Sequence, residues 1–285
     1  GDKGKIHYGA DDNASGIAIL IELAKTMAKT IKPKRTIVFL ACSGEEAGLI
    51  GSRYFVAHRK EYFKKEIFAN INLDTDGSLF GKKILILNGN TAKEWKFIFM
   101  GIGYTTGIKT EVINKQLDAS DQFAFIEQNI PAVQLFTGAT PNYHRPSDTF
   151  DKIDSNGLVK VATVAKEVVE YLANRTNPMT FTGNTEKEST TLSSQQENRS
   201  VTTGSIPAFD YNGEGIKIGA VIQNSPAEKA GLKKDDIIIA FDGKKVSNLK
   251  EYSNLLKQYK SGDTIKISFL RNQVKKTISL KLAER

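Results

Sequence analysis

The chain has 285 residues, of which 40% are hydrophobic and 25% charged, a composition typical of a globular protein with one or two domains. Its apolar runs are all shorter than 18 residues, which excludes a membrane-spanning helix, and its single cysteine, Cys42, excludes a disulfide framework. The formal charge is +8, and residues 203–285 carry +6 of it (15 basic minus 9 acidic). Because these lysines are scattered along the segment and no nucleic-acid-binding motif accompanies them, we interpret them as a solvated basic surface.

The first part of the chain alternates helix-like and strand-like patterns. The expected elements, in chain order, are a helix over 14–30, a buried strand over 36–40, a helix over 48–60, strands over 67–73 and 84–87, helices over 92–104 and 120–129, a strand over 131–136 and a long amphipathic helix over 155–174. This alternation predicts an α/β/α sandwich around a mostly parallel or mixed sheet. In such sheets the chemistry lies beyond the carboxyl ends of the strands.

A polar segment over 175–202 follows, rich in Ser, Thr, Asn, Gln and Glu. It has almost nothing apolar to bury, so we expect a flexible linker. Residues 203–285 then alternate β-rich runs with Gly and Asp turns, with helices expected near 225–230 and 248–259. The sequence therefore predicts two domains, residues 1–174 and a small, partly open β-rich barrel over 203–285.

Groups that bind metals or transfer protons follow the predicted strands of the first domain. Glu45-Glu46 follow the strand near 37–41, Asp74 follows 71–73, and Tyr143-His144 follow 133–136. Together with Asp12, they should crowd at one edge of the sheet. Carboxylates at such an edge repel one another unless a cation lies among them. Carboxylate and imidazole groups together form a ligand set suited to zinc, with manganese or cobalt possible.

Each of these patterns has a plainer interpretation when taken alone. Glu45-Glu46 also fits a solvated helix start, Asp12-Asn13 a helix cap, and residues 74–77 a turn. Their joint occurrence at successive strand ends favours a metal site over three separate coincidences.

Five strings in chain order, GADDNASG, SGEEAGLIGS, NLDTDG, SDQFAFIEQNIPAVQLFTG and YHRPSDT, resemble the co-catalytic zinc aminopeptidases of peptidase family M28 over roughly residues 7–174. The resemblance implies that Asp12 bridges two zinc ions and precedes a cis peptide. It implies one zinc on Glu46 and His144, and the other on Asp74.

The same resemblance implies the catalytic groups. Glu45 would be the general base that activates the water bridging the two zinc ions, and it would pass the proton to the leaving amine. Tyr143 would donate a hydrogen bond to the developing oxyanion. Asp121 matches an acidic position near the substrate, followed here by Gln122 where the family often has histidine.

One implied ligand has no counterpart. The family's second metal takes a histidine from a His-x-Asp motif upstream of GADDNASG, whereas His7 has the wrong spacing and His58 falls on a predicted helix surface. We therefore expect an N-terminally truncated chain that holds at most one zinc firmly and has little or no peptidase activity as given. The full-length protein is expected to hold two.

The strings SPAEKAGL and DDIIIAFDGKKV resemble a PDZ domain of the bacterial protease type. The resemblance implies that a peptide adds as a strand to an exposed edge, with its C-terminal carboxylate held by backbone N–H groups of Gly204, Ser205 and Ile206. Asp236 is expected to replace the glycine that usually precedes Asp-x-Ile, which would reshape that turn.

These observations favour a metallo-aminopeptidase with an accessory peptide-binding domain, acting on peptide substrates. An alternative is a catalytically silent peptidase fold whose working part is the PDZ module. A third keeps the fold but uses one zinc for glutaminyl cyclisation, which the two-metal ligand pattern disfavours. The resemblance implies a bacterial protein of the periplasm or cell surface.

Overall fold

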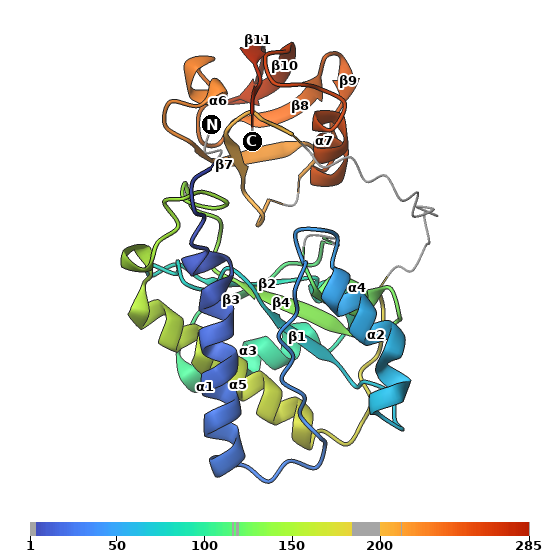
Figure 1. The fold of residues 1–285 in the computed structure, drawn as a ribbon. Coiled ribbons are helices and arrows are strands. Elements are labelled where there is room, and N and C mark those ends of the chain that lie inside the picture. Colours follow the sequence, from blue (N-terminus) through green and yellow to red (C-terminus); the bar gives the residue numbers. More distant parts are fainter. Residues whose placement is uncertain (1–3, 116, 118–119, 184–199, 212, 285) are drawn as a thin grey trace. The chain divides into compact units, whose positions relative to one another are not determined.

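A computed structural model describes residues 4–115, 117, 120–183, 200–211 and 213–284, which form two compact units (Figure 1). The larger unit comprises the described residues of Tyr8–Gly138 and Asp148–Glu186, and the smaller unit comprises those of Gly1–His7, Ala139–Ser147 and Lys187–Arg285. The larger unit mixes helices with a sheet and the smaller one is β-rich, which confirms the predicted fold class.

The sheet of the larger unit has four strands in the order β1-β4-β2-β3. β4 runs parallel to β1 and antiparallel to β2, and β3 runs parallel to β2, so the sheet is mixed. All five residues of β4 are buried, as expected for a strand covered on both faces. The bounds are Asn70–Leu73 for β1, Ile84–Leu87 for β2, Thr110–Val112 for β3 and Ala132–Phe136 for β4.

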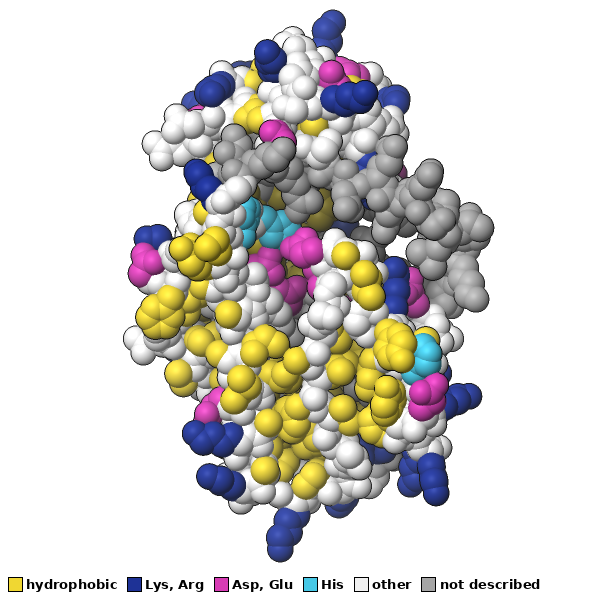
Figure 2. Space-filling view, viewed as in Figure 1, with side chains coloured by type: hydrophobic (Ala, Val, Ile, Leu, Met, Phe, Trp, Pro, Cys, Tyr) yellow, Lys and Arg dark blue, Asp and Glu magenta, His cyan; other side chains and the backbone are white. Residues whose placement is uncertain are grey.

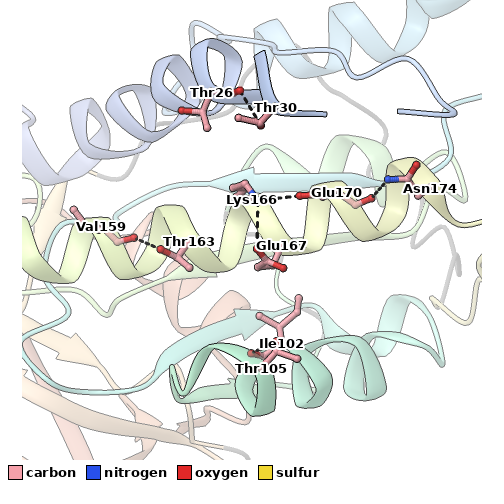
Figure 3. Close-up of polar contacts among 10 residues, drawn as sticks. All are labelled: Thr26, Thr30, Ile102, Thr105, Val159, Thr163, Lys166, Glu167, Glu170 and Asn174. Atoms are coloured by element: carbon pink, nitrogen blue, oxygen red, sulfur yellow. Dashed lines mark hydrogen bonds and ion pairs between the residues drawn. The ribbon is translucent and has the colours of Figure 1, made fainter. Parts of the chain in front are cut away.

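Three helices, α1 (Gly16–Thr30), α3 (Trp95–Thr106) and α5 (Ser155–Asn174), pack with β2 and β4 into the main hydrophobic core. Figure 3 shows α5 between α1 and α3, with its Lys166 ammonium donating to the Glu170 carboxylate at 2.9 Å. Two further helices, α2 (Ile50–Tyr62) and α4 (Gln122–Ile126), form a second apolar cluster with β4. Short helical turns are η1 (Ala10–Ser15), η2 (Gly89–Thr91) and η3 (Phe150–Lys152).

The predicted strand over 36–40 is wrong, because these residues form no strand. Val38 and Phe39 are 46% and 36% exposed, and Figure 2 shows hydrophobic side chains on the face that carries α1 and this segment. An apolar β-branched run supplies the side chains of a buried strand but not its hydrogen-bonding partner. Residues 36–40 are not hydrogen-bonded to any strand among the described residues, so they form no ladder.

The first residues of the predicted linker pack onto the larger unit. The backbone N–H of Thr180 donates to the Glu94 carboxylate at 3.0 Å, and the N–H of Thr182 donates to the Thr91 carbonyl at 3.0 Å. Met179 is only 9% exposed. The predicted linker is therefore shorter at this end, and its residues 184–199 lie outside the described residues.

The C-terminal part of the smaller unit has β5 (Val201–Thr202) as its first strand, two residues before the predicted start at 203, and β5 pairs with β12 (Ala283–Glu284). Its main sheet is antiparallel in the order β11-β10-β8-β7-β6, so β6 and β11 are its edges. The remaining bounds are Ser205–Pro207 for β6, Ile216–Val221 for β7, Pro226–Lys229 for α6, Ile237–Phe241 for β8, Lys244–Lys245 for β9, Leu249–Leu256 for α7, Thr264–Arg271 for β10 and Val274–Lys281 for β11.

The turn before β8 corrects one expectation. The residue with left-handed backbone is Asp235, whose φ is 71°, and not Asp236. Asp236 is instead buried, and both its oxygens accept hydrogen bonds of 2.7 Å from the Arg271 guanidinium. Asp235 therefore occupies the position where glycine would relieve the backbone, and Asp236 ties β8 to β10.

Candidate metal centre and catalytic site

The segment that carries Asp12 is fixed against the end of β1. Its Asp12–Asn13 peptide bond is cis, as the resemblance implies. The Asn13 amide donates from Nδ2 to the Leu73 carbonyl at 2.8 Å and accepts at Oδ1 from the Gly16 N–H at 3.0 Å. One side-chain amide thus holds the start of α1 beside the strand end that leads into Asp74.

The approach between α1 and β1 requires a residue without a side chain at position 16. A Cβ on Gly16 would lie 2.4 Å from Asn13 Oδ1 and 2.4 Å from the Leu73 carbonyl oxygen, far inside van der Waals contact. We expect Gly16→Ala to destabilise the larger unit by about 1–3 kcal/mol, because the two backbones must separate. Urea denaturation measures this change.

Gly101 provides the matched control, since it lies in α3 and a Cβ added to it would have open space within 4 Å. Gly101→Ala is expected to stabilise the protein by about 0.5–1 kcal/mol through helix propensity. Equal effects of the two substitutions would contradict the close approach at Gly16.

Two further carboxylates, to which the sequence analysis gives no role, fix the Asp12 segment. Asp148 accepts from the N–H groups of Asp11 and Asp12 at 2.9–3.1 Å. Asp11 accepts from the Gly77 N–H at 2.7 Å and the Ser78 hydroxyl at 2.5 Å, and burial raises its pKa. The signal for Asp148 is its place in the YHRPSDT string, of which the sequence analysis assigns only Tyr143 and His144 to the site.

The structure brings three of the predicted ligands together. One ligand atom each from Asp12, Glu46 and His144 lies within 4.8 Å of the others, the one such group of three among the described residues. Zinc bonds to oxygen and nitrogen are about 2 Å long, so a single ion needs donors no more than about 4 Å apart. Small side-chain adjustments close that difference, and two carboxylates with one imidazole fit zinc.

Asp74 lies outside this group of three. Its Oδ2 accepts from the Ser120 hydroxyl at 2.6 Å and its Oδ1 from the Thr75 hydroxyl at 3.1 Å. Ser120 in turn accepts from the Asn72 amide at 2.9 Å. Burial raises the pKa of Asp74 to about 6, and the charge of Asp12 adds to this, whereas the hydroxyl bonds oppose it. Asp74 is thus oriented near Asp12, but among the described residues it belongs to no group of three candidate ligand atoms.

Glu45 lies half-buried at the turn before α2, where its carbonyl accepts from the N–H groups of Gly48 and Leu49 at 2.9 Å. Burial raises the pKa of the Glu45 carboxyl to about 8, and the negative charges of neighbouring carboxylates add to this, first Asp74, then Glu46, Asp121 and Asp12. These interactions show that the Glu45 carboxyl lies close to the candidate ligand residues. A cation bound there would favour its ionised form.

Comparison with protein families agrees with this assembly of carboxylates. Residues 2–169, more than half of the chain, match the family model of peptidase family M28. The chain belongs to peptidase family M28. Residues 185–282 match the family model of the PDZ domain, so the M28 domain is followed by a PDZ domain.

The M28 domain has characterised relatives. Aminopeptidase YwaD of Bacillus subtilis is 28% identical over 192 residues, which are 61% of this chain and 40% of YwaD. An aminopeptidase from Aneurinibacillus sp. strain AM-1 has a solved structure that is 29% identical with a TM-score of 0.54, covering 61% of this chain and 42% of that one. This chain thus spans less than half the length of either aminopeptidase.

The PDZ domain has relatives of another kind. The serine protease Do-like HtrA of Bacillus subtilis is 44% identical over 73 residues, which are 25% of this chain and 16% of HtrA.

Within the described ranges, no helix of the M28 chain has the length and apolar character needed to cross a bilayer.

The remaining predicted residues of the M28 domain have defined surroundings. The Asp121 carboxylate accepts from the Ser52 hydroxyl of α2 at 2.5 Å, and burial raises its pKa. Tyr143 stacks on His144 with ring centroids 3.8 Å apart. His58 lies on α2 with its Nδ1 at 2.8 Å from the Tyr54 carbonyl, on the helix surface where it was predicted. Burial raises the pKa of the Cys42 thiol to about 11, which suits a packing residue and not a nucleophile.

Proposed function

We propose that this chain is part of a zinc-dependent aminopeptidase that releases N-terminal residues from peptides. The observation that carries the proposal is the approach of Asp12, Glu46 and His144 to one another, with Glu45 next in sequence to a ligand and itself outside the group. Membership of family M28 supports the same class of reaction.

Asp12, Glu46 and His144 are proposed to hold one zinc ion. Asp74, together with the shared Asp12, is proposed to hold a second in the full-length protein. Zinc, when bound, polarises a peptide carbonyl and lowers the pKa of water. The hydroxyls of Ser120 and Thr75 orient the Asp74 carboxylate and so prepare it for that role.

Proton transfer is assigned to Glu45. It accepts a proton from the attacking water and delivers it to the leaving amine, so one carboxylate serves as base and then as acid. Tyr143 donates a hydrogen bond from its hydroxyl to the oxyanion that forms at the carbonyl. Asp121, whose charge contributes to the raised pKa of Glu45, supplies a negative charge that attracts the free α-ammonium group of the substrate.

The PDZ domain is proposed to bind the C-terminus of a peptide at Gly204, Ser205 and Ile206. Gly204 has a φ of 77°, and Ile206 is paired with Ala220 of β7, which leaves the other side of edge strand β6 for an added strand. We also propose that the protein is located in the periplasm or at the cell surface. A silent peptidase fold with a working PDZ domain is the competing function.

Hydrolysis of aminoacyl-p-nitroanilides by the full-length protein tests the proposed activity. We expect turnover that a zinc chelator abolishes and that zinc restores, and no turnover of the N-acetylated substrates, which lack the free amine. Activity that persists in chelator, or equal cleavage of N-acetylated substrates, would contradict a metallo-aminopeptidase. Inactivity of a verified zinc-loaded sample would favour the competing function.

A further inference from the structure

The loop between β5 and β6, where a peptide carboxylate is proposed to bind, already has acceptors for its backbone donors. The Gly204 N–H donates to the Thr202 hydroxyl oxygen at 3.0 Å, and the Ser205 N–H donates to the Thr203 hydroxyl oxygen at 3.3 Å. A bound carboxylate would have to replace these neutral acceptors. It can do so, because hydrogen bonds to a charged oxygen are about twice as strong.

Three hydroxyl groups contact one another at the loop between β5 and β6. The Thr203 hydroxyl lies 2.8 Å from that of Tyr252 and 2.9 Å from that of Ser205, and the Ser205 and Tyr252 hydroxyls are 3.3 Å apart. Each hydroxyl has one hydrogen and two lone pairs, so the three satisfy one another. Thr203 is fully buried and Tyr252 is 2% exposed, which shows that the triangle is covered.

Tyr252 reaches this triangle from α7, so its ring spans the distance between that helix and the start of β6. The ring packs edge-on against Phe241 with centroids 5.9 Å apart. Side chains of a strand added to β6 would point alternately to the two faces of the sheet, and the Tyr252 hydroxyl reaches the start of β6 from one of these faces. Because Tyr252 is almost fully buried, its ring already fills the space beside the loop, and the side chain next to the carboxylate would find no open pocket there.

The rest of β6 offers little to a ligand. The strand has three residues, and Pro207 has no N–H to donate. The ladder between β6 and an added peptide is consequently short. Recognition would therefore depend mainly on the last residue of the peptide, the one next to the loop that the Tyr252 hydroxyl contacts.

We propose that Tyr252 sets the specificity of the PDZ domain, so that it admits peptides ending in a small residue such as glycine, alanine or serine and excludes those ending in leucine, valine or phenylalanine. The inference rests on the proposed binding of peptide C-termini. Beyond that proposal, the inference states which C-terminal residues bind and assigns this specificity to the Tyr252 side chain.

Fluorescence anisotropy with the complete 285-residue chain tests the inference. The probes are two labelled decapeptide pools, randomised at upstream positions, that end in alanine or in leucine with a free carboxylate, together with their C-terminal amides. We expect the wild type to bind the alanine pool at least about tenfold more tightly than the leucine pool. Tyr252→Leu should bring the ratio to one or below, since it frees space for a larger side chain.

Tyr259→Leu is the matched control. Tyr259 also packs against Phe241, with centroids 5.3 Å apart, but its hydroxyl donates to Asp242 and not to the loop. We expect this variant to keep the wild-type preference. Because the two affinities are compared on one sample, a partly unfolded variant changes both equally and leaves their ratio intact.

The outcomes separate the inference from the function on which it rests. Equal or tighter binding of the leucine pool by the wild type, or an unchanged ratio in Tyr252→Leu, would overturn the role of Tyr252. If neither free-carboxylate pool binds either protein, or if the amides bind equally well, the binding of peptide C-termini itself is wrong, and the inference falls with it.

Discussion

Replacement of Glu45 by glutamine is expected to lower kcat of the full-length protein by about 10³–10⁴-fold and to leave its bound zinc unchanged. Glutamine keeps the size of the side chain but cannot accept a proton from water or deliver one to the amine. Glu45 is not one of the three residues whose ligand atoms gather, so its loss removes no donor. Steady-state hydrolysis of aminoacyl-p-nitroanilides and elemental analysis of the same sample measure the two quantities.

Glu61→Gln is the control for this prediction, because Glu61 also belongs to the α2 region but is exposed. The same chemical change there should alter neither kcat nor zinc content. Wild-type activity in a zinc-loaded Glu45→Gln variant would refute the assignment of proton transfer to Glu45. Loss of zinc from that variant would show instead that Glu45 is a ligand.

Replacement of His144 by alanine is expected to lower the zinc affinity of the 285-residue chain by at least about a hundredfold, more than the loss of an outer hydrogen-bond partner causes. The wild-type chain should retain about one zinc ion after dialysis, held by Asp12, Glu46 and His144. Without the imidazole only two carboxylates remain, too few to compete with water. Competition with a chelating dye measures the affinity.

His58→Ala is the matched control, since it removes a histidine from the surface of α2. We expect no change in its zinc affinity. Retention of zinc by His144→Ala would show that another residue completes the site. Two zinc ions on the wild-type chain would mean that the second site has a ligand beyond Asp74 and Asp12.

Elements whose local pattern is self-sufficient could be predicted closely. The bounds of α5 and β2 agree with the sequence, and α5 has an N-cap in Asp154, whose Oδ1 accepts from the Gly157 N–H at 3.0 Å. The strand predicted over 36–40 shows the limit. Its hydrophobicity was read correctly, but strand formation depends on a partner elsewhere in the chain, which local sequence does not specify.

The candidate site divides in a similar way. The residues that bear its chemistry stand in short strings after strands, and Glu45, Glu46 and Asp74 could be named from those strings alone. The groups that fix these residues in place could not be predicted, because their hydrogen bonds join residues far apart in the sequence. Asp148 binds the backbone of Asp11 and Asp12 across 136–137 positions, and Ser52 binds Asp121 across 69.

The two edges of the PDZ sheet have a consequence for the behaviour of the protein in concentrated solution. An exposed strand edge invites pairing with another chain and then aggregation. Here β11 carries the exposed lysines 275, 276 and 281, whose like charges repel a second copy, and β6 is only three residues long and ends in Pro207. Replacing these lysines with threonine would leave the fold intact and make the purified protein prone to form fibrils or precipitate.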